Sequence, residues 1–165
     1  MRRLLKGLLG TSTCLVSSLA MANSAVQLEE PFAVECTGIS TSTGNTSGRD
    51  REVKHDLGKQ VYVLDQQKQT VSRALEPRQE FDPVCNIKGD MAFVSFSPGL
   101  ISADSNSPFE SDPYSTCKFE LNRMTGKGSQ TLRMEWKGGR FHELKWEFDC
   151  AKTAIPVFDL SKRKF

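Results

Sequence analysis

Apolar and polar residues alternate in short runs along most of the chain beyond residue 31. In "FAVECTGI" (32–39), for example, Phe32, Val34 and Cys36 share one face of an extended segment. Successive side chains of a strand point to opposite faces of a sheet, so this period of two predicts a half-buried strand. No later stretch sustains the i, i+3, i+4, i+7 spacing of an amphipathic helix. The pattern therefore predicts an all-β fold.

Similar runs, separated by turn-forming residues, predict the remaining strands. They lie at 59–64 ("KQVYVL"), 70–75 ("TVSRAL"), 84–87 ("VCNI"), 91–96 ("MAFVSF"), 116–122 ("TCKFELN"), 130–136 ("QTLRMEW") and 141–150 ("FHELKWEFDC"). Turns or breaks are expected between them, at 65–69, 76–83, 123–129 and 137–140. Longer loops are expected at 40–50 and 97–115; the second is a binding loop, a mobile surface segment or a hidden edge strand. The strands are expected to form an antiparallel meander that closes into a small barrel or a sandwich.

The register of the last hairpin can be predicted by counting across its turn. A three-residue loop at 138–140 places Met134 opposite Leu144. A two-residue glycine turn is the commoner hairpin and gives the same pairing once a bulge is allowed for. In this register Glu135 lies opposite Glu143, and like charges directly opposite one another cost stability.

The cysteines predict two disulfides. Four of the five, Cys36, Cys85, Cys117 and Cys150, are in phase with apolar neighbours and are expected to point into the core. Their shortest spacing is 32 residues, which does not match the paired cysteines of zinc sites. Three connectivities are open. We favour Cys36–Cys150, which joins the first and last strands, and Cys85–Cys117, which closes the long loop.

The first 22 residues are typical of a secretory signal peptide. A basic start at Arg2, Arg3 and Lys6 precedes a mostly apolar and small-residue run at 8–19 and an "AMA" motif at 20–22. Cleavage is expected after Ala22, with Ala25 as the second choice, and it removes the fifth cysteine, Cys14. The domain organisation is therefore predicted as a signal peptide (1–22), an N-terminal linker (23–31), an antiparallel β domain (32–150) and a C-terminal tail (151–165). The protein is expected to be periplasmic or secreted, with no transmembrane segment after cleavage.

Processing also changes the charge balance. The whole chain has 22 Lys and Arg against 20 Asp and Glu, a net charge of +2. The signal carries three of the basic residues and no acidic residue, so cleavage leaves 19 against 20 and a net charge of −1. The apparent basicity belongs to the targeting segment, and no nucleic-acid partner is expected.

The sequence contains no recognisable catalytic or metal-binding motif. His55 is followed directly by Asp56, but adjacent residues of a strand point apart, so they do not form a dyad. His142 has no partner at a metal-ligand spacing, and no serine lies in a G-x-S-x-G context. Candidate carboxylate pairs for a glycosidase are Glu143 with Glu147 and Asp104 with Asp112. Nothing fixes their separation, as that chemistry requires. We expect no catalytic, cofactor-binding or metal-ligating residue, and no enzyme.

Aromatic residues and a glycosylation sequon are the remaining features. The aromatic candidates for a ligand cup are Phe93, Phe96, Phe119, Trp136, Phe141, Trp146 and Phe148. A hollow barrel would use them to contact a ligand, whereas a filled one would use most of them as core, which is the role we expect. The sequon at Asn45–Ser47 indicates an exposed loop.

Two short motifs carry a family resemblance. A strand ending in Leu64-Asp65 precedes a polar turn, and "NRMTG" (122–126) forms a later turn before the final Cys150. Over roughly residues 32–150 the chain resembles a group of small, exported, all-β proteins of proteobacteria. The group has no assigned activity, so the resemblance implies no site residues. Periplasmic inhibitors of C-type lysozyme are similar in size, export and β-barrel build. Their Ser-Gly-x-x-Tyr loop is missing, since Ser47-Gly48-Arg49 is not followed by tyrosine.

We therefore expect an exported, non-enzymatic binding or interaction module for a protein or an envelope component. A lipocalin-like carrier of a small apolar ligand is one alternative, and an inhibitor of an envelope-targeting hydrolase is another. The turn within 117–126 is expected to be scaffold, and the loops 40–50 and 97–115 are the first places to look for a site.

Overall fold

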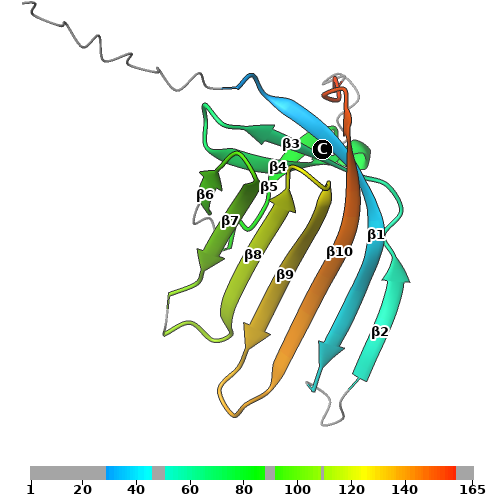
Figure 1. Cartoon of the computed structure of the whole chain (residues 1–165). Coiled ribbons are helices and arrows are strands. Elements are labelled where there is room, and N and C mark those ends of the chain that lie inside the picture. The colour runs from blue at the N-terminus through cyan, green and yellow to red at the C-terminus, as the bar shows by residue number, and fades with distance from the viewer. Residues whose placement is uncertain (1–28, 46–50, 88–91, 109, 159–165) are drawn as a thin grey trace, which may run out of the picture.

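The computed structural model describes residues 29–45, 51–87, 92–108 and 110–158, which are coloured in Figure 1. These residues contain ten strands and a short 3₁₀ helix, joined by turns and loops: β1 Phe32–Gly44, β2 Arg51–Asp56, β3 Gln60–Asp65, β4 Thr70–Leu75, η1 Glu76–Arg78, β5 Glu80–Pro83, β6 Phe93–Phe96, β7 Leu100–Asn106, β8 Tyr114–Asn122, β9 Lys127–Glu135 and β10 Phe141–Thr153. The expected all-β class is confirmed.

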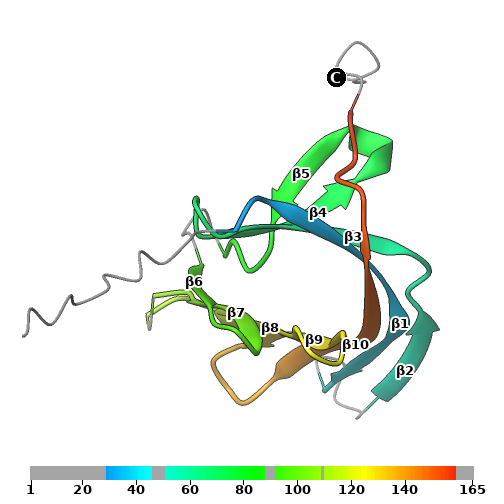
Figure 2. The same cartoon turned by 45° about the horizontal axis from the view of Figure 1, so that its top comes forward.

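All the strands belong to one antiparallel sheet. Its order is β5-β4-β3-β1-β10-β9-β8-β7-β6, and β2 pairs with the outer half of β1. The sheet curls into a half-barrel with two arms: β3 to β5 form one arm and β6 to β8 the other (Figure 2). The strands β1 and β10 form the bend between them. The expected barrel is thus a half-barrel, and a sandwich of two separate sheets is not formed.

Three aromatic rings fill the middle of the half-barrel. Tyr62 comes from β3, Phe119 from β8 and Phe148 from β10, so they join both arms and the bend. Their ring centroids lie 5.4 to 5.9 Å apart, and each residue is at most 5% exposed. Aromatic pairs at such distances add about 0.5–1.5 kcal/mol to their burial. The centre of the molecule is therefore a packed core.

Both disulfides have the connectivity that the sequence favoured. Cys36 and Cys150 are direct partners in the β1–β10 ladder, 114 residues apart in the chain. Cys85 follows β5 at the edge of one arm and is bonded to Cys117 on β8 of the other. The first disulfide closes the bend, and the second ties the two arms together across the concave side.

The expected strand at 84–87 is wrong, although its inward residues were identified correctly. Cys85 has a positive φ of 60°, which interrupts an extended run. Residues 84 and 85 form a turn, and Val84 N donates a hydrogen bond to Val71 O of β4 at 2.8 Å. Cys85 and Ile87 are nevertheless both buried, because this segment passes over the core between the arms.

The predicted register of the β9–β10 hairpin is also wrong. Leu144 lies opposite Leu132 rather than Met134, because the turn takes up residues 136–140. Gly139 N donates to Trp136 O, and two successive glycines with positive φ allow this wider turn. The shift replaces the expected like-charge pair with Arg133 opposite Glu143, at 3.2 Å. Since partners shift by two residues, every side chain keeps its predicted face.

Both expected loops contain strand. β1 continues through Gly44, and residues 46–50 lie outside the described residues. Within 97–115, β7 lies between β6 and β8, so the hidden strand is interior and β6 is the edge. Two further strands, β2 and β5, were not predicted; β5 lies within the break expected at 76–83.

The structure bears on the predicted domain boundaries only in part. The predicted signal peptide (1–22) lies outside the described residues, as does most of the 23–31 linker. β10 ends at Thr153, three residues beyond the predicted end of the β domain. The tail is described to Phe158, whose ring lies 4.7 Å from that of Phe81 on β5. No helix in the described ranges has the length and hydropathy to cross a membrane.

Candidate functional site

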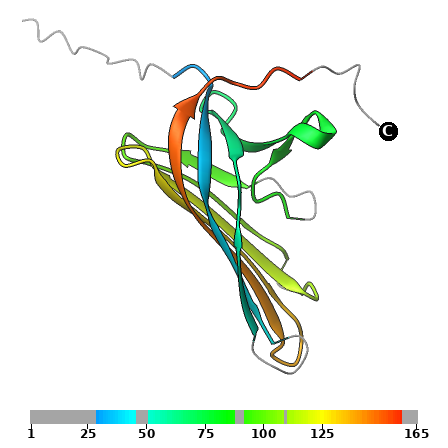
Figure 3. The same ribbon diagram turned by 90° about the vertical axis from the view of Figure 1, so that its right-hand side faces the viewer.

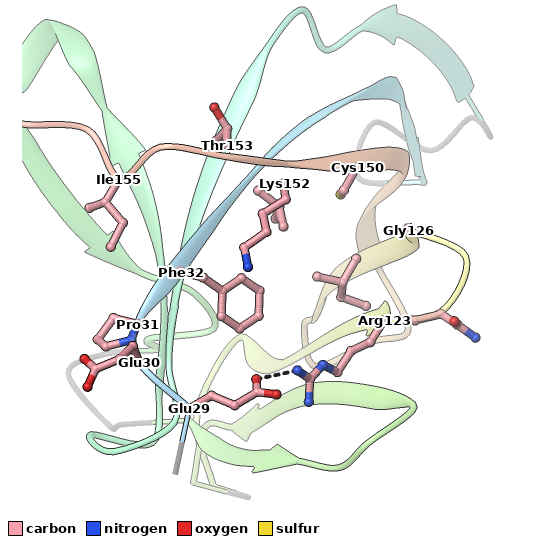
Figure 4. Close-up of a pocket in the computed structure, with 13 residues that line it drawn as sticks. Glu29, Glu30, Pro31, Phe32, Arg123, Gly126, Cys150, Lys152, Thr153 and Ile155 are labelled. Carbon is pink, nitrogen blue, oxygen red and sulfur yellow. Dashed lines mark hydrogen bonds and ion pairs between the residues drawn. The ribbon is translucent and has the colours of Figure 1, made fainter. Parts of the chain in front are cut away.

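A groove of about 920 Å³ opens at one end of the half-barrel, which we call the mouth. Its walls are formed by four segments (Figure 4): residues 29–31, the start of β1, the β8–β9 turn and the end of β10. The turn within 117–126 was expected to be scaffold alone, yet it supplies Leu121, Asn122, Arg123 and Gly126 to the lining. None of the described residues of 40–50 and 97–115 lines the groove.

The β8–β9 turn is fixed from within and from β10. Asn122 Oδ1 accepts hydrogen bonds from the backbone of Met124 at 2.9 Å and Thr125 at 3.0 Å, which closes an Asx turn. Gly126 has a φ of 72°, and a Cβ at this position would collide with the carbonyl oxygen of Cys150. Cys150 N in turn donates to Gly126 O at 2.8 Å. The sequence "NRMTG" therefore holds Arg123 in a defined place.

Arg123 reaches across the mouth from this turn. Its guanidinium donates through Nη1 to Ser97 O at 3.2 Å and through Nη2 to the Glu29 carboxylate. The side chain is only 22% exposed, and its Cζ lies 5.8 Å from the centroid of the Phe32 ring. Arg123 thus binds one carboxylate, that of Glu29, at the groove, while Nη1 is anchored to the backbone of Ser97.

Lys152 is a second cation over the same ring. Its Nζ lies 5.7 Å from the Phe32 centroid. Lys152 lies opposite Val34, next to the final residue pair of the β1–β10 ladder. Among the described residues no carboxylate lies within ion-pair distance of Lys152. Each cation is attracted electrostatically to the Phe32 ring, because the π-face of an aromatic ring is negative.

Glu29 shows how the mouth treats an anion. The hydrogen bond from Arg123 is the largest influence on this carboxyl and lowers its pKa below the usual value. Burial opposes that shift, and the charges of Arg123 and Lys152 add smaller lowering effects. The mouth thus stabilises a carboxylate in its ionised form. Apolar walls from Val34 and Leu121 lie beside it. The groove can therefore bind an anionic group that is joined to an apolar one.

The described lining of the mouth groove has neither a free thiol nor a histidine. Cys150 is in a disulfide, and both histidines lie elsewhere in the sheet. Within the part of the chain that the structure describes, no group of three or more His, Cys, Asp or Glu side chains is arranged to hold a metal ion.

The two histidines are not brought together. His55 lies on β2 opposite Ser40, and His142 lies on β10 opposite Gly44. His142 Nε2 is 2.9 Å from Ser42 Oγ, so it forms a hydrogen bond between strands. Asp56, the neighbour of His55, accepts a hydrogen bond from Gly58 N in the following turn.

The candidate carboxylate pairs have other partners. Glu143 and Glu147 lie on the outer face of β10 and pair with Arg133 at 3.2 Å and with Lys145 at 2.9 Å, respectively. Asp104 is exposed on β7 opposite Lys118, whereas Asp112 precedes β8 and accepts from Lys137 N at 3.4 Å. None of these carboxylates lines the mouth groove.

Two other expectations can be compared with the structure in part. The sequon residue Asn45 is half-buried rather than in an exposed loop, because its Oδ1 accepts from Phe141 N at 2.8 Å. Most of the seven aromatic candidates are buried or half-buried, but Phe93 on the edge strand β6 is 78% exposed.

Sequence reasoning missed the residues of the groove because they come from distant segments. Glu29 was assigned to a linker, Lys152 to a tail and Arg123 to scaffold. One signal could have found Lys152: the favoured Cys36–Cys150 pair implies, by counting along antiparallel strands, that Lys152 lies opposite Val34.

Comparisons of the chain with protein-family models, with curated proteins and with solved structures find no match. The resemblance to exported proteobacterial proteins accordingly stays a prediction.

Proposed function

We propose that the protein is an exported, non-enzymatic binding module, and that its mouth groove binds an anionic group of a protein or an envelope component. The observation that carries the proposal is the placement of Arg123 and Lys152 over the Phe32 ring in the groove. A guanidinium and an ammonium suit a carboxylate or a phosphate. The aromatic and aliphatic walls suit an apolar group attached to it.

The geometry favours an interaction module over the alternatives. A lipocalin-like carrier needs interior space for its ligand, whereas Tyr62, Phe119 and Phe148 occupy the middle of the half-barrel. The two disulfides are compatible with an oxidising compartment such as the periplasm.

The test is a calorimetric titration of the oxidised protein with decanoate, decyl phosphate and uncharged decanol. We expect the two anions to bind saturably and decanol to bind at least about tenfold more weakly, since an ionic hydrogen bond contributes about 1.5–3 kcal/mol. The stronger of the two anions identifies the preferred headgroup. Saturable binding of neither anion would contradict the proposal.

Lys152→Gln is expected to weaken binding of the anions about tenfold, because it removes one of the two cations. The matched control is Lys137→Gln in the β9–β10 turn at the opposite end of the sheet, which should leave the affinity unchanged. Equal affinities for the two variants would place the anion elsewhere.

A further inference from the structure

The end of the sheet opposite the mouth, which we call the far end, extends beyond the β3–β5 arm. β1 pairs with β3 only as far as Cys36 opposite Gln60, yet it continues to Gly44. The remaining eight residues rise about 25 Å at a strand's usual spacing. Figure 3 shows β1, β9 and β10 projecting past the arm with no second layer of described chain against them.

Apolar side chains collect on the inner side of this projection. By the register, Leu132, Leu144 and Trp146 have the same orientation as the core residues Cys117 and Phe148. We call the surface formed by Val53, Leu132, Met134, Leu144 and Trp146 the far-end inner face. Val53 is 46% exposed, and the other four are half-buried; Leu132 and Trp146 pack against the edge of the core.

Charge is segregated between the two sides of the same strands. The carboxylates of Glu135, Glu143 and Glu147 point outward, where Arg133 and Lys145 pair with them. The register places Arg51, His55 and His142 on the inner side, together with the hydroxyls of Ser40 and Ser42. At the described positions of β1, β2, β8, β9 and β10, no Asp or Glu has the inward orientation. The far-end inner face is therefore apolar, rich in donors and free of acid.

We propose that the far-end inner face docks an acidic amphipathic helix of a partner protein. The backbone groups of β1, β9 and β10 are paired within the sheet, so this face offers side chains only. An extended peptide lying on it would bury unpaired amide groups, whereas a helix satisfies its own. Leucine-type residues of the helix would cover Leu144 and Trp146, and its carboxylates would meet Arg51 and His55.

Strand addition at the nearby edge is disfavoured. The outermost strand at this end is β2, whose six residues are all exposed and include four of alternating charge at 51, 52, 54 and 56. Charged edge strands resist pairing with other chains. Recognition at the far end should therefore use the sheet face rather than its edge.

Trp146 provides the readout. The chain has two tryptophans, so Trp136→Phe leaves Trp146 as the only one. The probe is a synthetic amphipathic helix of about 18 residues, roughly five turns, with leucine on one face and glutamate on the other. We expect it to shift Trp146 emission to the blue and to bind at least about tenfold more tightly than the same peptide with lysine in place of glutamate.

Matched variants localise the binding. Leu144→Glu on the inner side should reduce affinity at least about tenfold, while Thr131→Glu on the outer side, opposite Lys145, should not. Arg51→Gln, at an exposed position that does not contribute to the core, should weaken binding a few-fold and covers the case in which Leu144→Glu fails to fold. Decanoate titrations of all variants should be unchanged, which separates this site from the mouth groove.

Four outcomes would overturn the proposal. Equal binding of the glutamate and lysine peptides would remove the acidic partner. A Trp146 shift that depends on protein concentration without peptide, together with dimers in sedimentation, would assign the face to a second copy of the chain. A shift with phosphatidylglycerol vesicles but not with peptide would assign it to a membrane. No shift with any probe would leave the face without a binding role.

Discussion

Asp65 and Asn122 each end a strand, and each uses a side-chain oxygen to hold the turn that follows. Asp65 Oδ1 accepts from Lys68 N at 2.9 Å, and Lys68 Nζ lies 3.2 Å from the other carboxylate oxygen. Asn122 makes the equivalent bonds after β8. These are the residues on which the resemblance to exported proteobacterial proteins rests. In this chain their common role is turn formation.

Asp65→Ala should lower the free energy of unfolding by about 1–2 kcal/mol at neutral pH, because a nearly buried cap is lost. Burial is the largest single effect on Asp65 and raises its pKa. The hydrogen bonds and the charge of Lys68 together outweigh burial, so the net pKa lies below the usual value. The contribution is therefore complete above the unfolded-state pKa of about 4 and is lost as pH falls through the lower folded-state value.

Urea denaturation across this pH range measures the effect of Asp65→Ala. The control is Asp149→Ala, whose ion pair with Lys127 is mostly exposed and should contribute little at any pH. A difference between parent and Asp65→Ala that persists unchanged into strong acid would contradict the assignment.

At the scale of elements, strands with apolar alternation could be predicted and strands without it could not. β4 has the predicted bounds, and β3 and β10 differ by one to three residues, because large apolar residues alternate along them. β2 has six exposed residues and so has no buried face to detect. In β7 the inward positions include Ala103 and Ser105, so small size rather than apolarity marks its buried side.

The hairpin register and the groove could not be predicted from the sequence for a different reason. The register depends on one turn's backbone, in which Gly138 and Gly139 both adopt positive φ. The groove depends on the pairing of β1 with β10, which brings Phe32 and Lys152 together from the two ends of the β domain. Alternation reports which face a residue occupies, but it does not report which distant strand lies beside it.

The sequence separation of the cysteines predicts how much each disulfide contributes to the free energy of unfolding. Removing Cys36–Cys150 by alanine at both positions should cost about 2–5 kcal/mol. Removing Cys85–Cys117 should cost roughly 1 kcal/mol less, because its cysteines are 32 rather than 114 residues apart and close a shorter loop. Chemical denaturation of the two double variants makes the comparison, and equal losses would mean that loop entropy does not dominate.

At the scale of the whole molecule, one sheet provides both the core and two separate open surfaces. The aromatic centre divides the mouth groove from the far-end inner face, so a ligand at one end need not compete with a partner at the other. The disulfides hold the bend and both arms together, which suits a small domain outside the reducing cytoplasm.

The proposed export has a direct measurement. Mass spectrometry of the protein from the periplasmic or extracellular fraction should find Asn23 as its first residue, with all four remaining cysteines oxidised. A cytosolic protein that begins at Met1 with free thiols would contradict the proposal.

The position of β1 in the sheet has a consequence for the order of folding. β1 lies between β3 and β10, so one of its edges is paired by the last strand that the structure describes. If the chain is translocated from its N-terminus, as proposed, β1 emerges more than 100 residues before β10, with one backbone edge unpaired. Such non-local pairing slows folding and leaves a strand edge open to other chains. The polar Ser-Thr run at 40–43 lowers the hydrophobicity of the unpaired edge of β1. A segment that resembles a loop in the sequence can therefore reduce aggregation of the chain until β10 has been translocated and pairs with β1.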